Sequence, residues 1–108
     1  MAPHLKIATH HVPDAEAAVR NMRQQARELT THYGAITGCR FSLSHDASLG
    51  YEARLELLFP QHQVIVNGGG AAAEQALKTA LAAADAQLKI LAQRDATVAP
   101  RKAHAKAA

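Results

Sequence analysis

Apolar side chains follow two alternating spacings along this chain, and the switches between them predict the order of its secondary-structure elements. Residues 5–9 alternate apolar and polar side chains, as a half-buried strand does. From about Asp14 to Tyr33 the apolar residues recur at helical spacing within an arc of about 100°, the width of a face that packs on a core. A period of two returns after Ile36, so we expect a second strand there.

Three strands are predicted in succession after the first helix. Cys39, Phe41 and Leu43 alternate with polar residues, and later runs repeat the alternation after segments rich in turn-forming residues. The glycine run Gly68–Gly70 is expected to release the chain from the sheet and to act as a hinge before a long amphipathic helix. The predicted strands and this last helix cover residues 36–44, 51–57, 63–67 and 71–94.

The order β-α-β-β-β-α predicts an α+β fold, a two-layer sandwich whose four-stranded sheet carries both helices on one face. Residues 1–95 would form this single domain. Residues 96–108 have no periodicity and few large apolar groups, so we expect a disordered basic tail. The other face of the sheet is left to water or a partner, and its polar residues are Arg40, Ser42, Ser44, Glu52, Arg54 and Glu56.

Charge is balanced over most of the chain. Residues 1–95 hold nine Lys or Arg and nine Asp or Glu, so the formal net charge of +3 lies on Arg101, Lys102 and Lys106 of the tail. Cys39 is the only cysteine, which excludes an intrachain disulfide. With no secretory leader in the first residues and no apolar run of about 20 residues, a cytoplasmic protein without a membrane partner is expected.

Two groups of cations are the candidate RNA-binding residues. Arg20, Arg23 and Arg27 fall within about 60° of one another on the first helix, and Lys78 and Lys89 take a similar flank on the last helix. If the two flanks adjoin, five cations could follow a phosphate backbone. The alternative is a solvated helix face, since acidic residues lie among these cations. In the tail, Arg101 and Lys102 would add a salt-sensitive contribution.

No catalytic or metal site is predicted. His10 and His11 could be imagined near His45 or His62, but adjacent strand residues point to opposite faces and no Cys or carboxylate joins them at ligand spacing. Cys39 falls on the core side of its strand, where a thiol behaves as a small hydrophobe. The glycine run lacks the Lys-Ser/Thr of a P-loop. We therefore expect no enzyme, cofactor or small-molecule substrate.

Several short segments, in order, resemble the family of ribosome hibernation promoting factors and ribosome-associated inhibitors, also labelled sigma factor modulation proteins. The resemblance covers about residues 5–91 and includes no catalytic signature. Its segments are Leu5–Val12, Glu16–Ala18, Leu29–Tyr33, Ala53–Leu57, Gly70, Ala76–Leu77 and Gln87–Leu88.

The resemblance implies a protein that binds the small ribosomal subunit through two basic helices and excludes messenger and transfer RNA from the decoding region. This chain departs from the family at helix positions where Lys or Arg is expected. The residues found there are Gln25, Glu28, Ala83, Ala86 and Ile90.

Two other functions are also compatible with the sequence. The chain could be a diverged protein-interaction module that forms a homodimer through its sheet or a free edge strand. A double-stranded RNA-binding domain shares the later elements, but it lacks the first strand, and its lysine cluster is replaced here by Ala71–Ala73.

Overall fold

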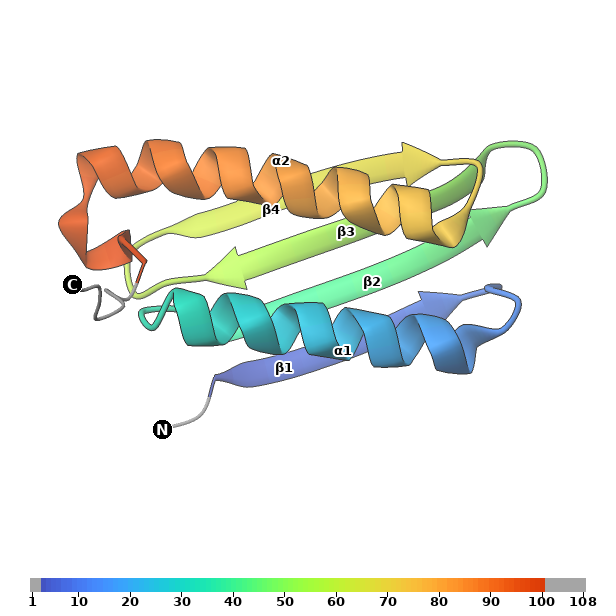
Figure 1. The fold of residues 1–108 in the computed structure, drawn as a ribbon, viewed down its shortest axis with the longest axis horizontal. Helices are drawn as coiled ribbons and strands as arrows, with labels where there is room; N and C mark the ends of the chain where they lie inside the picture. The colour runs from blue at the N-terminus through green and yellow to red at the C-terminus, as the bar shows by residue number, and fades with distance from the viewer. Residues whose placement is uncertain (1–2, 101–108) are drawn as a thin grey trace, which may run out of the picture.

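The structure, a computed structural model, describes residues 3–100 of the chain. It contains four strands, two long helices and a final short 3-10 helix, in the order shown by Figure 1. No helix in this part of the chain has the length and apolar character needed to cross a membrane. The elements are β1 (His4–His10), α1 (Ala15–His32), β2 (Gly38–Asp46), β3 (Gly50–Leu58), β4 (Gln63–Gly70), α2 (Ala73–Arg94) and η1 (Ala96–Val98).

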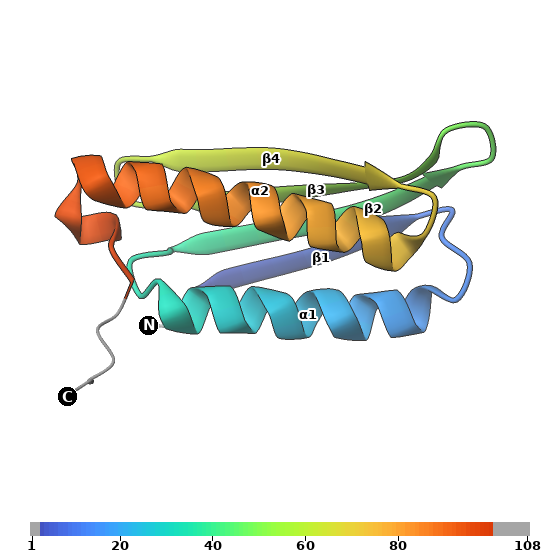
Figure 2. The same cartoon turned by 45° about the horizontal axis from the view of Figure 1, so that its top comes forward.

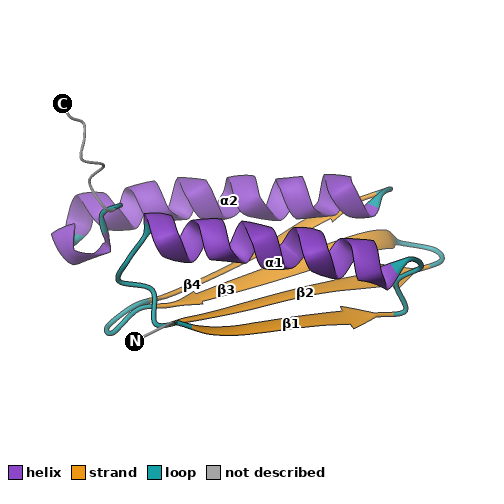
Figure 3. Cartoon of the chain, turned by 60° about the horizontal axis from the view of Figure 1, so that its bottom comes forward, coloured by secondary structure: helices purple, strands orange, loops and turns teal. Residues whose placement is uncertain are grey.

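The strands form one sheet in the order β1-β2-β3-β4. β1 runs parallel to β2, because α1 carries the chain back to the starting end, whereas the β2–β3 and β3–β4 pairs are antiparallel. Figure 3 shows both helices on one face of this sheet. The predicted α+β sandwich with two helices on one face is confirmed.

Each helix packs on the sheet through a face of small and apolar residues that recur at helical spacing. On α1, Ala18, Met22 and Ala26 recur every four residues and are buried. Figures 1 and 2 show α1 over β1 and β2, and α2 over β3 and β4. Inward side chains of the central strands, among them Phe41 and Leu55, complete the core and are almost fully buried.

The glycine run has a different role from the predicted hinge. Gly68, Gly69 and Gly70 are the last residues of β4 and remain paired with β3, so the expectation that they release the chain is wrong. A Cβ atom on Gly68 would lie 2.3 Å from the backbone N of Ala80 and 2.7 Å from the carbonyl O of Ala76. Glycine therefore lets the backbone of α2 approach β4 directly.

Ordered structure also continues past Asp95, where a disordered tail was expected to begin. Residues 96–98 form η1, and the Val98 side chain is 1% exposed within the core. The sequence-based boundary is wrong because a single valine, in a segment without periodicity, fills a gap at the end of the sandwich. Residues 101–108 lie outside the described part of the chain.

A carboxylate ties this segment to the turn between β3 and β4. Asp95 Oδ1 accepts hydrogen bonds from the backbone N and the hydroxyl of Thr97, at 3.0 and 2.7 Å, and Asp95 Oδ2 lies 2.6 Å from His62 Nε2. Since a carboxylate only accepts, His62 Nε2 carries the shared proton. Bonds from Thr97, and then from His62, lower the pKa of Asp95 from 3.8 to about 2.

The contact at Gly68 predicts a position-specific cost of adding one methyl group. Gly68→Ala should lower the free energy of unfolding by about 3 kcal/mol, because backbone atoms of α2 must move away. Gly69→Ala is the matched control, since its Cβ would meet only the carbonyl O of Tyr51, at 3.6 Å, and should change stability by less than about 1 kcal/mol. Urea denaturation of both variants measures the difference, and equal stabilities would contradict the close helix–strand contact.

The Asp95 contacts predict a stability loss in acid. Because the folded pKa lies below 3.8, the stabilisation is complete above about pH 4 and decreases as the pH falls toward about 2. Asp95→Asn should therefore be less stable than the parent chain at pH 7, and the difference should shrink below about pH 4. Thermal melts across this range measure it, and a pH-independent difference would contradict the assignment.

Candidate nucleic-acid interface

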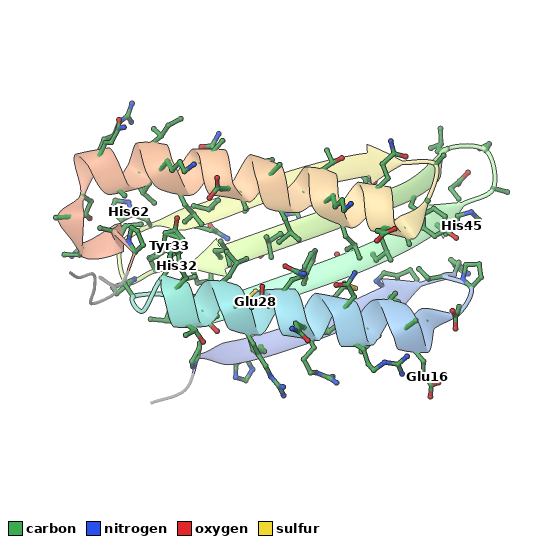
Figure 4. All side chains as sticks on the ribbon, in the orientation of Figure 1. Glu16, Glu28, His32, Tyr33, His45 and His62 are labelled. Carbon is green, nitrogen blue, oxygen red and sulfur yellow. The ribbon has the colours of Figure 1, made fainter. Side chains whose placement is uncertain are left out.

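The three arginines predicted to bind RNA lie together on the exposed surface of α1. Arg20, Arg23 and Arg27 are exposed, and at about 100° per residue they share one stripe with Glu16. Figure 4 shows Glu16 projecting from the side of α1 that faces away from α2. Within residues 3–100, no carboxylate forms a salt bridge with these arginines. We call these three residues the arginine stripe.

The space between the two helices has a different chemistry. The arginine stripe points roughly 150° away from the α1 positions that line this space. The two predicted basic flanks therefore do not face each other across this space. Glu28, on the α1 side that lines it, accepts a hydrogen bond from Gln24 Nε2 at 3.2 Å. The groove has a volume of about 370 Å³ and is lined by Gln25, Glu28, Leu29, His32, Leu81 and Asp85.

The two predicted lysines of α2 lie on the flank that borders this groove. Lys89 Nζ is 3.1 Å from Asp85 Oδ2, an i,i+4 pair on an exposed surface. Lys78 is exposed and forms no salt bridge in the described chain. The remaining candidates, Arg101 and Lys102, lie outside the described residues, so their RNA contacts stay a prediction.

A third group of cations lies on the open face of the sheet. Lys6, Arg40 and Arg54 border a hollow of about 220 Å³ whose lining includes Ser42 and Glu56. Sequence reasoning placed Arg40 and Arg54 on this face without a function and did not single out Lys6. The alternation of side chains along each strand could have identified this group from the sequence, because it places all three side chains on the same face of the sheet.

The other sequence-level candidates occupy structural positions. Tyr33, Phe41 and Phe59 are buried, so they offer no exposed ring for base stacking. Tyr51 is half-buried and lies beside His45, with ring centroids 4.4 Å apart. Residues 3–100 contain no group of three or more His, Cys, Asp or Glu side chains placed to hold a metal ion.

Two solved structures share this arrangement of elements. The N-terminal domain of Protein Y from Thermus thermophilus superposes with a TM-score of 0.66 and 16% identity, covering 82% of this chain and 98% of that domain. The chain has the Protein Y fold. A ribosomal subunit interface protein from Coxiella burnetii superposes with a TM-score of 0.66 and 12% identity, covering 82% of this chain and 96% of the other. No protein-family model and no curated protein matches the sequence.

The Protein Y fold confirms, at the level of architecture, the resemblance inferred from the sequence. The cations of this chain do not lie at the helix positions where the resemblance implied basic residues. Gln25 and Glu28, two of the positions where a basic residue was expected, line the groove between the helices. The arginine stripe lies instead on the far side of α1.

The burial of Cys39 predicts an unreactive thiol. The residue is 1% exposed, and desolvation raises the pKa of its thiol to about 11. Only about a thousandth of the thiol would be ionised at pH 8 even before steric protection is counted. The folded chain should therefore resist labelling by a disulfide reagent at pH 8, and one thiol per chain should react after unfolding in urea. Rapid labelling of the folded chain would contradict this.

Proposed function

We propose that this chain binds the small ribosomal subunit through rRNA phosphates and inhibits translation by occupying that site. The observation that supports the proposal is the arginine stripe of α1, which forms no salt bridge within residues 3–100 and is presented on the Protein Y fold. The name of the Coxiella burnetii neighbour, a ribosomal subunit interface protein, supports a ribosomal partner.

The geometry of the stripe suits a phosphate backbone. Arg20 and Arg27 are separated by about 10 Å along the helix axis, with Arg23 between them. Guanidinium groups donate two parallel hydrogen bonds to phosphate, and this contact carries no base specificity. Because the described chain has equal numbers of cations and acids, binding depends on this local cluster rather than on net charge.

Two further groups of cations add to the attraction for RNA. Lys78 is free to reach RNA from α2, whereas Lys89 must exchange its contact with Asp85 for one with phosphate. Arg101 and Lys102 add a salt-sensitive attraction. We rank these contacts below the arginine stripe, because the groove between the helices is lined by two acids.

Co-sedimentation with small ribosomal subunits across a salt series tests the proposal. The triple variant Arg20→Gln, Arg23→Gln, Arg27→Gln should bind at least tenfold more weakly. It should also reduce the log–log salt slope by about 2 to 3, since three phosphate contacts are lost. Its unfolding free energy should stay within about 1 kcal/mol of the parent, because exposed unpaired arginines contribute little to stability.

Two further variants serve as controls for the triple variant. Glu16→Gln removes the acid from the stripe and should strengthen binding. Lys6→Gln with Arg40→Gln removes positive charge from the opposite face and should leave sedimentation unchanged. Addition of the parent chain to a cell-free translation reaction should reduce protein synthesis, and the triple variant should reduce it less. Unchanged pelleting of the triple variant would rule out the arginine stripe as the interface.

A further inference from the structure

The open face of the sheet concentrates positive charge around one hollow. Lys6 lies directly opposite Arg40 across the β1–β2 pair, and Arg54 lies opposite Ser42 across the β2–β3 pair. The hollow between them measures about 220 Å³. Ala8 and Ser42 line it, and these small side chains leave the space that the surrounding longer side chains border. Figure 3 shows that neither helix covers this face.

One carboxylate braces the two arginines. Glu56 Oε2 accepts a hydrogen bond from Arg54 Nε at 3.1 Å, and Glu56 Oε1 lies 3.9 Å from Arg40 Nη1. The Glu56 side chain is 16% exposed, whereas those of Arg40 and Arg54 are 62% and 50% exposed. Glu56 is thus held beneath guanidinium groups that keep further N–H donors for a ligand.

The third cation of the hollow is Lys6. Lys6 forms no salt bridge within residues 3–100, and the residue facing it across the strand pair is another cation. Two positive charges held close together repel each other. An anion bound between Lys6 and Arg40 would relieve that repulsion. Three cations and one carboxylate leave a local charge of about +2.

We propose that this hollow binds the phosphate group of a compact phosphomonoester, such as a nucleoside monophosphate. A dianionic phosphate matches the local charge, and the arginine forks with the lysine ammonium are the donors that phosphate prefers.

The residues that flank the hollow along the strands indicate that its ligand is small. Here a row means the residues that lie side by side across neighbouring strands. On one side, the next row holds His10, Ser44 and Glu52, and on the other side it holds His4, Gly38 and Leu58. Neither row contains a Lys or Arg, so the permanent positive charge does not continue along the sheet as a polynucleotide track requires. The site lies on the face of the sheet opposite the helices, so it is independent of the proposed ribosomal interface.

An NMR titration of the full-length ¹⁵N-labelled chain tests the site. The probes are AMP and a short single-stranded RNA, each added at constant ionic strength with sodium chloride as the balancing salt. AMP should shift the amide signals of residues 6–8, 40–42 and 54–56 in a saturable way. The RNA, whose phosphates are diesters, should bind this site at least tenfold more weakly per phosphate.

Variants separate this site from the arginine stripe. Lys6→Gln with Arg40→Gln should weaken AMP binding at least tenfold, and Arg40→Lys, which keeps the charge but loses the fork, should give an intermediate loss. The triple variant of the arginine stripe should bind AMP like the parent, whatever its effect on ribosome binding. The proposal is overturned by non-saturable AMP shifts, by shifts centred on α1 or α2, or by an equal loss of AMP binding in both multiple variants. Tighter binding of RNA at the same residues would also overturn it.

Discussion

The close contact between β4 and α2 determines how the two layers of this protein meet. A glycine in a strand and alanines on a helix remove the side chains that would normally separate the layers, so backbone atoms approach one another at Gly68. This contact holds α2 over β3 and β4. The first helix then covers β1 and β2, and a groove remains between the helices. Asp95 and His62 secure the far end of α2 to the same sheet.

This arrangement leaves the charged residues on distinct surfaces. The nine cations and nine acids of residues 1–95 cancel in number but not in position. The arginine stripe occupies the outer side of α1, whereas the groove between the helices is lined by Glu28 and Asp85. A second basic group surrounds a hollow on the open sheet face. A protein with no net formal charge over its described residues can therefore still present two separate groups of cations.

Much of the fold followed from hydrophobic spacing, and the exceptions have physical causes. Alternating strands and two amphipathic helices were sufficient to predict the α+β sandwich. The glycine run was misread because glycine serves hinges and close packing equally well, and only the position of Ala76 and Ala80 distinguishes them. The end of the domain was misplaced because Val98 shows no local pattern and is buried only through tertiary contact.

For the candidate site, the sequence could predict which residues share a side of one helix, but not how the two helices lie relative to each other. Helical spacing groups Arg20, Arg23 and Arg27 on one stripe, and all three are exposed on α1. It could not tell which side of α1 would face α2, because that depends on how both helices pack on the sheet. The hollow around Lys6 required the register of three strands, since Lys6 and Arg54 are distant in sequence. Cross-strand pairing is the step that sequence periodicity leaves undetermined.

Electron cryo-microscopy of the full-length chain bound to small ribosomal subunits tests whether the arginine stripe is the surface that contacts rRNA. We expect density for the Protein Y fold with the outer side of α1, including Arg20, Arg23 and Arg27, against rRNA phosphates. The open sheet face should be turned away from those phosphates. Density in which the sheet face or the groove between the helices contacts the RNA, with the arginine stripe in solvent, would contradict this expectation.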